Sequence, residues 1–236
     1  MLEHFAFAID NATRYGDTDV FPFPFENHIF FDHKTETIDL LQKLHSNFNE
    51  WISRYPPANE TAFVPINYVG FRWATQIDPF WNLYFLALVS SIAPAIESVR
   101  ISPAHSCVFS YRYKRSDVTA ELFSRDWGWF QFMEKSVEIA KKNQFIVVCD
   151  IADFYARINH HRLENALAQL KLGNDIPSRI LKFLLNFSNT YSFGLPVGGP
   201  AARLLSELVL NQIDHLLLQH GITFCRFADD YHLFVP

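Results

Sequence analysis

The stretch Phe145-Ile-Val-Val-Cys149, followed directly by Asp150-Ile-Ala-Asp153-Phe-Tyr155, decides the fold of this chain. The first part is a short apolar run rich in β-branched residues, which predicts a strand. The strand ends abruptly at a carboxylate, so we expect Asp150 to lie at the edge of a sheet, where loops and ligands meet. An Asp after a strand is also a common turn residue, so this reading depends on what the rest of the chain supplies.

A second carboxylate site lies near the end of the sequence. Residues 224–235 have the pattern of a β-hairpin, with a tight turn at Ala228-Asp229-Asp230. Two adjacent ionised carboxylates repel each other unless a cation lies between them. Mg²⁺ prefers oxygen ligands, and two such ions about 3.5–4 Å apart can activate an attacking oxygen and stabilise a leaving one. Asp150, Asp229 and Asp230 would suffice for this if their strands lie side by side; otherwise the Asp-Asp pair is a solvated turn.

The third site is Gly194-Leu-Pro-Val-Gly198-Gly199-Pro200, which precedes a predicted helix over residues 200–219. Glycine lets a backbone approach a ligand closely, and Pro200 suits a first helical turn. A helix N-terminus also favours anions. Taken alone, the segment is only a turn; the three sites in this order carry the functional hypothesis. The residues expected to face inward on the helix are Leu204, Leu205, Leu208, Ile213 and Leu217.

Hydrophobic periodicity predicts the remaining elements. Asn159 is expected to cap a helix, and the uncharged run between Asp78 and Glu97 to form a buried helix rather than a membrane span. Residues 21–25, with alternating Pro and Phe, should be extended, with the Phe side chains packed on the core. The order of elements favours an α+β fold. The helices are predicted over residues 36–54, 80–93, 128–142 and 161–171, and the strands over residues 62–72 and 107–113.

Composition limits the function classes. The chain has 236 residues, of which 49% are hydrophobic, enough for one large or two small globular domains. The net charge is −5, and only residues 100–142 carry an excess of positive charge, so charge alone does not indicate a nucleic-acid binder. Three cysteines without C-x-x-C spacing argue against zinc and against a disulfide framework. No signal peptide is visible, and these features together predict a protein of the reducing cytoplasm.

The three sites together resemble the palm motifs of reverse transcriptases. The first motif corresponds to Asp150-Ile-Ala-Asp-Phe-Tyr155, and the next to Gly194-Leu-Pro-Val-Gly198 with the helix that follows, including Ser206, Leu210, Asn211 and Asp214. Arg226-Phe-Ala-Asp229-Asp230 resembles the (Tyr/Phe)-Ala-Asp-Asp box, and Ser110-Tyr-Arg112 resembles a motif of the fingers. The resemblance spans about residues 66–236 and is most specific in the palm.

Three details are similar to the bacterial defence-associated enzymes of the abortive-infection and unknown-group types. They are the segment at 21–26, the run Gln76-Ile-Asp-Pro79, and Val197 where most retroviral and intron enzymes carry Gln. Some members of this group make DNA without a conventional template or prime from protein. The resemblance therefore leaves open templated and untemplated synthesis, and an RNA or a protein primer.

The resemblance also implies residue roles. Asp150 and Asp229, with the carbonyl of Ile151 and a weaker contribution from Asp230, would hold Mg²⁺ or Mn²⁺. Tyr155 would be a steric gate beneath the sugar that favours dNTPs. The residues assigned to dNTP binding are Tyr155, Arg112, Arg72, Ile151 and Gly198.

The implied fold is the fingers and palm of a right-hand polymerase, with an antiparallel RRM-like palm sheet packed on helices and no thumb in this chain. The expected divisions are an N-terminal extension over residues 1–65, fingers over 66–143 and palm over 144–236. The implied function is RNA-directed or template-independent DNA polymerisation in antiviral (phage) defence, by nucleotidyl transfer of dNTPs. The partners would be dNTPs, an RNA template, a DNA product and a second copy of the chain, with no membrane.

Two other functions fit parts of the pattern. A non-catalytic palm-fold scaffold or nucleic-acid sensor in a defence complex would fit the low positive charge, but would have no physical need for three clustered carboxylates. A palm-fold nucleotide cyclase or ligase would use the same two-metal layout. The Gly-Leu-Pro-x-Gly segment before the long helix favours the polymerase over the latter.

Overall fold

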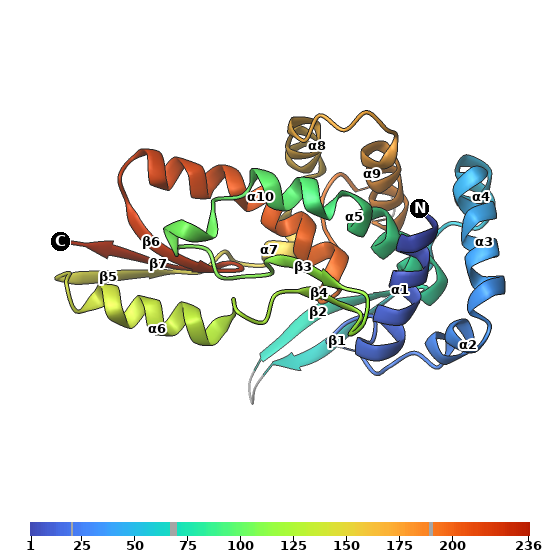
Figure 1. The fold of residues 1–236 in the computed structure, drawn as a ribbon, viewed down its shortest axis with the longest axis horizontal. Helices are drawn as coiled ribbons and strands as arrows, with labels where there is room; N and C mark the ends of the chain where they lie inside the picture. Colours follow the sequence, from blue (N-terminus) through green and yellow to red (C-terminus); the bar gives the residue numbers. More distant parts are fainter. Residues whose placement is uncertain (20, 67–69, 189–190) are drawn as a thin grey trace.

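The computed structural model of the chain describes residues 1–19, 21–66, 70–188 and 191–236, without the side chains of residues 66, 72 and 73. The molecule is elongated, with the C-terminus and a small sheet at one end and the N-terminal helices at the other (Figure 1). Helices and antiparallel strands are mixed along the chain, so the α+β class predicted from the order of elements is confirmed.

The sheet that carries the carboxylates has three antiparallel strands, β5 (Phe145–Cys149), β6 (Thr223–Phe227) and β7 (Asp230–Val235), in the order β5-β7-β6. The predicted strand and hairpin are both confirmed. Helices α6 (Trp129–Ala140) and α10 (Pro200–Gln219) pack against the hairpin (Figure 1). These two helices match the predictions for residues 128–142 and 200–219.

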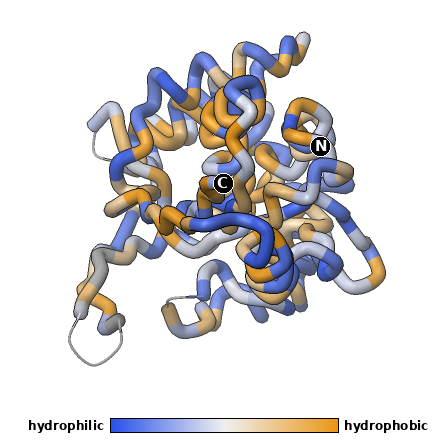
Figure 2. Tube along the Cα trace, turned by 90° about the vertical axis from the view of Figure 1, so that its left-hand side faces the viewer, coloured by the Kyte–Doolittle hydropathy of each residue, from blue (hydrophilic) through white to orange (hydrophobic). Residues whose placement is uncertain are grey.

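Strand β5 is apolar but exposed along its whole length. Figure 2 looks onto the end of the molecule at which the chain ends, where hydrophobic stretches of the chain run beside hydrophilic ones. The apolar sequence of β5 therefore reflects its strand conformation and not burial in this chain.

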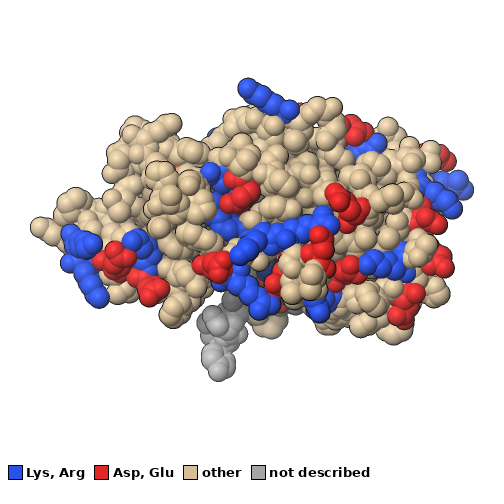
Figure 3. All heavy atoms as spheres, viewed as in Figure 1, with Lys and Arg blue, Asp and Glu red and all other residues tan. Residues whose placement is uncertain are grey.

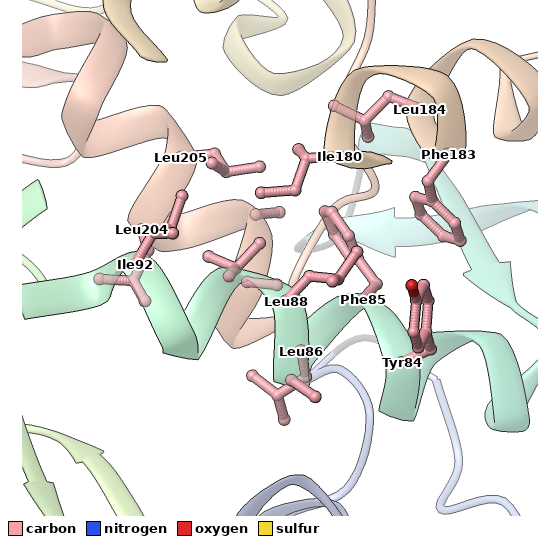
Figure 4. Close-up of a cluster of buried hydrophobic side chains, with 14 of the residues drawn as sticks. Tyr84, Phe85, Leu86, Leu88, Ile92, Ile180, Phe183, Leu184, Leu204 and Leu205 are labelled. Carbon is pink, nitrogen blue, oxygen red and sulfur yellow. The ribbon is translucent and has the colours of Figure 1, made fainter. Parts of the chain in front are cut away.

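The main core forms around α5 (Pro79–Val99), and the predicted buried helix is confirmed. The rings of Phe85 and Phe183 stack with centroids 4.6 Å apart, which joins α5 to α9 (Ile176–Phe187). Leu204 and Leu205 approach the same cluster from α10 (Figure 4). Helix α5 is long and apolar enough to cross a membrane, but 72% of its most apolar window is buried inside the molecule, as expected for a core helix.

The N-terminal part is more helical than predicted. It contains α1 (Leu2–Tyr15), α2 (Glu26–Asp32), α3 (Lys34–Ser46) and α4 (Phe48–Arg54), so the helix predicted over 36–54 is interrupted at Asn47. Residues 21–25 are not helical, as expected, but Phe23 and Phe25 are exposed. The prediction that the Phe side chains of this segment pack on the core is therefore wrong for these two residues. Phe23 stacks on the His28 ring instead, with centroids 5.0 Å apart.

The remaining elements form two hairpins and two helices. They are β1 (Asn59–Ile66), β2 (Gly70–Ile77), β3 (Tyr113–Ser116), β4 (Glu121–Phe123), α7 (Phe154–Arg157) and α8 (His160–Gln169), with a short 3-10 helix η1 (Pro103–His105). The N-cap of α8 is Asn159, whose side chain accepts a hydrogen bond from the His161 N–H, as predicted.

Three local predictions are corrected. The single strand predicted over residues 62–72 is divided between β1 and β2, which pair antiparallel. The strand predicted over 107–113 is only a bridge between Val108 and Arg226, and β3 begins at Tyr113. Tyr111 has φ of +45°, a left-handed conformation that interrupts a strand. Ile213, expected to face inward on α10, is 43% exposed, because the inward face at this point of the helix is formed by Leu210 and Asp214 instead.

Candidate active site

A cavity of about 890 Å³ lies where the carboxylate-bearing ends of β5 and the β6–β7 hairpin meet. It brings together six of the residues predicted from sequence, although they are far apart in the chain. These residues are Asp150, Ile151, Tyr155, Gly198, Asp229 and Asp230.

Strand register explains why the carboxylates meet. Cys149 lies opposite Tyr231 across β5 and β7, and Phe227 lies opposite Asp230 across the hairpin. The residue after Cys149 is Asp150, so it emerges beside Asp230 at the same end of the sheet. Ala228, at the hairpin tip, has φ of +52°, which is unfavourable for a residue with a Cβ. Strain of this kind persists only where the surrounding structure enforces it, and it is common at functional sites.

The electrostatics of the cavity favour a cation. Partial burial, and then the nearby charge of Asp150, raise the pKa of Asp230 above its usual range. The described residues contain no preformed cluster of three or more His, Cys, Asp or Glu side chains of the kind that encloses a metal by itself. Mg²⁺ usually binds one or two carboxylates and takes its other ligands from water and substrate phosphates. Asp150, Asp229, Asp230 and the Ile151 carbonyl have the hard oxygen donors that this ion prefers.

Tyr155 forms part of the wall of the cavity from α7. Its carbonyl accepts a hydrogen bond of 2.8 Å from the Leu195 N–H, which ties α7 to the glycine-rich segment. Burial raises the pKa of the Tyr155 hydroxyl far above its ordinary value, so the side chain is a neutral wall. Gly198, on the same segment, has φ of +95°, a conformation that favours glycine.

The two arginines predicted to contact a triphosphate are not brought into the cavity. Arg112 is 3% exposed and does not line it. Its guanidinium donates to Glu97 Oε1 at 2.9 Å and to the Ile101 carbonyl at 2.7 Å, so these donors are directed at the protein. This geometry does not support the expected contact. The side chain of Arg72 lies outside the described residues, although its backbone is in β2.

Three charged residues that line the cavity were not predicted from the sequence, namely Asp19, Arg157 and Arg203. Glu207, which was not predicted either, does not line the cavity and is fully buried on α10. A charged residue among Leu204, Leu205 and Leu208 on the inward face of a helix was a signal for Glu207. Asp19 carries no sequence signal, because its position follows only from how residues 16–19 fold back onto the start of α10.

Comparison with solved structures gives low similarity over nearly the whole chain. The structures titled "Partial Cas6-RT-Cas1--Cas2 complex" and "Cas6-RT-Cas1--Cas2 complex" each match over 99% of this chain with 19% identity and a TM-score of 0.47. The chain spans 36% and 23% of those two chains. No curated protein matches it.

A family model gives the clearer result. The model described as reverse transcriptase (RNA-dependent DNA polymerase) matches residues 87–236, a stretch that includes Asp150, the glycine-rich segment and the Asp229–Asp230 pair. The match covers more than half of the chain and ends on the same sheet that gathers the carboxylates. The chain therefore belongs to the reverse transcriptase family, whose members are nucleotidyltransferases that polymerise DNA on RNA.

Proposed function

We propose that this chain catalyses DNA synthesis from dNTPs, by attack of a hydroxyl group on the α-phosphate of the nucleotide. The observation that carries this proposal is the convergence of Asp150, Asp229 and Asp230 in one cavity with Tyr155 and Gly198. Bound Mg²⁺ or Mn²⁺ would activate the attacking oxygen and stabilise the leaving one. The three carboxylates and the Ile151 carbonyl would hold the metal.

The other residues of the cavity have positioning roles in this proposal. The neutral ring of Tyr155 would lie against the sugar and exclude a 2′-hydroxyl, because a wall of fixed shape discriminates by size. The backbone at Gly198 would lie close to the nucleotide, since no side chain intervenes there. Arg72 stays a candidate for the triphosphate, whereas the buried position of Arg112 gives no support for that role.

The biological setting is also proposed from sequence. The segment at 21–26, the run Gln76–Pro79 and Val197 support a defence-associated enzyme acting against phage in the cytoplasm. We propose dNTPs, an RNA template and a DNA product as its ligands, an RNA or protein primer, and self-association. We also propose that residues 66–143 act as fingers and residues 144–236 as palm.

A non-catalytic scaffold is the second candidate. The observation that favours it is the charge of the cavity, where two arginines stand against five aspartates. A surface of that charge attracts nucleic acid weakly, because phosphate contacts supply much of the affinity.

Incorporation of labelled dNTPs tests the proposal. Wild-type protein would be compared with the Asp229→Ala/Asp230→Ala double variant, in Mg²⁺ and in Mn²⁺, with and without a primer and an RNA template. Product from the wild type alone would support the polymerase, and its dependence on template would separate copying from untemplated synthesis. Equal product from both proteins would refute the site assignment. Absence of product together with absence of Mn²⁺ binding at millimolar metal would favour the scaffold.

A further inference from the structure

An ion pair joins the N-terminal segment to the start of α10. Arg203 Nη2 lies 2.6 Å from Asp19 Oδ2, so the pair links residues that are 184 positions apart in sequence. Both residues line the cavity that contains Asp150, and both line an adjoining cavity of about 270 Å³. The pair therefore lies between the candidate active site and its neighbouring cavity.

The arginine is held more firmly than its partner. The Arg203 side chain is 22% exposed, and its guanidinium carbon lies 5.1 Å from the centre of the Tyr111 ring. A guanidinium stacked on an aromatic ring keeps its plane and offers the donors at its edge. The Asp19 side chain is 65% exposed and accepts from that edge. Asp19 is thus the partner that solvent or a competing anion can displace at low cost.

The residues just before Asp19 are fixed. Asp17 is 3% exposed, and its Oδ1 accepts a hydrogen bond of 2.7 Å from Asn27 Nδ2. A Cβ added at Gly199 would lie 3.1 Å from the Asp17 carbonyl oxygen, so the segment is fitted closely against the glycine-rich loop. Asp19 therefore reaches Arg203 from an anchored segment, which keeps its carboxylate at a high local concentration.

In the part of the chain that the structure describes, the cavity is lined by five aspartates and two arginines, so Arg203 is one of its few cationic side chains. Among the residues described as lining it, the arginines are Arg157 and Arg203. The Arg157 side chain is 71% exposed and pairs with Asp153, the N-cap residue of its own helix α7. A phosphate that enters among five aspartates needs a cationic donor, and a guanidinium matches phosphate oxygens in pairs. The Arg203 guanidinium is held in place for that contact by the Tyr111 ring. In this structure its donors are directed to the carboxylate of Asp19.

We propose that Arg203 binds a phosphate group of the substrate and that Asp19 is its built-in competitor, displaced when the phosphate binds. The phosphate belongs either to the nucleotide or to the nucleic-acid backbone, since both present the same oxygens. The inference deepens the proposed function and rests on it for the identity of the substrate, but the competition itself is a binding property.

Equilibrium binding by calorimetry tests the competition in the full chain. The proteins are wild type, Asp19→Asn, Arg203→Gln, Arg203→Lys and the double variant Asp19→Asn/Arg203→Gln. The matched control is Asp126→Asn, which breaks the exposed ion pair with Lys114; neither residue lines either cavity. The probes are inorganic tripolyphosphate, dATP with Ca²⁺, and a single-stranded DNA oligonucleotide. Thermal melts verify that each variant is folded.

We expect Asp19→Asn to tighten binding of at least one probe about 3- to 10-fold, because it removes an exposed ion pair that competes with the ligand. Arg203→Gln should weaken the same probe about 10-fold or more, with partial recovery in Arg203→Lys. In the double variant, Asp19→Asn should no longer tighten binding, because the arginine with which Asp19 pairs is absent. Asp126→Asn should match wild type. A response to dATP and tripolyphosphate identifies the nucleotide as the source, and a response to the oligonucleotide alone identifies the backbone.

Several results would overturn the inference. These are unchanged or weaker binding in Asp19→Asn for all three probes, additive effects in the double variant, and no measurable binding by any protein. The polymerase proposal would fail separately, if wild type and Asp229→Ala/Asp230→Ala incorporated dNTPs to the same extent. If the binding series shows the expected competition but the protein incorporates no dNTP, the phosphate site is supported and the polymerase reaction is rejected.

Discussion

Arg226 on β6 and Asp214 on α10 form a buried bidentate ion pair, with Nε 2.8 Å from Oδ1 and Nη2 2.6 Å from Oδ2. The same guanidinium donates to Glu207 Oε1 at 3.0 Å. Burial opposes the charge on Arg226, but Glu207 and Asp214 outweigh it and hold its pKa above the ordinary value. The network fixes the helix that follows the glycine-rich segment to the strand that leads to Asp229.

Replacing Arg226 with Leu should lower the free energy of unfolding by about 3–5 kcal/mol, because the buried Asp214 loses its cation and Glu207 keeps only Arg100. Urea denaturation measures the change. Arg125→Gln is the control, since Arg125 is exposed and pairs with Glu121 on the surface, where a salt bridge contributes about 0–1 kcal/mol. A loss below about 1 kcal/mol in Arg226→Leu would show that the network does not stabilise the fold in this way.

Asp229→Asn should reduce dNTP incorporation by at least about 100-fold, because a metal ligand is replaced by a neutral amide while the shape is kept. A bound metal contributes several kcal/mol to charge stabilisation, and about 1.4 kcal/mol corresponds to tenfold in rate. Steady-state incorporation with Mg²⁺ measures the effect. Asp126→Asn, at an exposed position outside the cavity, should retain wild-type rates. Substantial activity in Asp229→Asn would remove this residue from the site.

Tyr155→Ala should raise the incorporation of rNTPs relative to dNTPs by about 10-fold or more, because the ring that excludes the 2′-hydroxyl is gone. The ratio of kcat/KM for the two nucleotides is the measurement. Tyr155→Phe keeps the ring and should keep the wild-type ratio. An unchanged ratio in Tyr155→Ala would mean that this ring is a wall of the cavity without contact to the sugar.

Asp17 should make stability depend on pH. Burial raises its pKa from 3.8 to about 6, so between these values the folded state holds a proton that the unfolded state has released. The free energy of unfolding should therefore fall as pH rises from about 4 to about 6, by on the order of 2–3 kcal/mol from this group. Asp17→Asn should remove that part of the slope.

Denaturation at several pH values between 4 and 7 measures the difference between Asp17→Asn and wild type. Asp32→Asn, at an exposed position on α2, should keep the wild-type slope. Parallel curves for Asp17→Asn and wild type would contradict the raised pKa. Asp17 lies next to the candidate site, because its backbone lies against Gly199 at the start of α10.

Local patterns predicted the elements that carry the site. The strand before Asp150, the hairpin at Asp229 and the helix from Pro200 depend on neighbouring residues only, through apolar periodicity, a tight turn and a helix start. Where a prediction failed, long-range packing was the reason. Val108 forms a single bridge to Arg226, and Arg112 turns toward Glu97, because the segment between Cys107 and Arg112 fits against β6 and α5 instead of pairing as a strand.

The sequence by itself determined the chemistry available to this protein, since the order of its carboxylates, glycines and apolar runs sets the strands and turns that can present them. The tertiary structure alone decided which side chains share a cavity. Strand register brings Asp150 beside Asp230, and the fold-back of residues 16–19 brings Asp19 to Arg203. Such contacts join residues far apart in the chain, and only the packing of the whole core against α5 and α10 determines their positions.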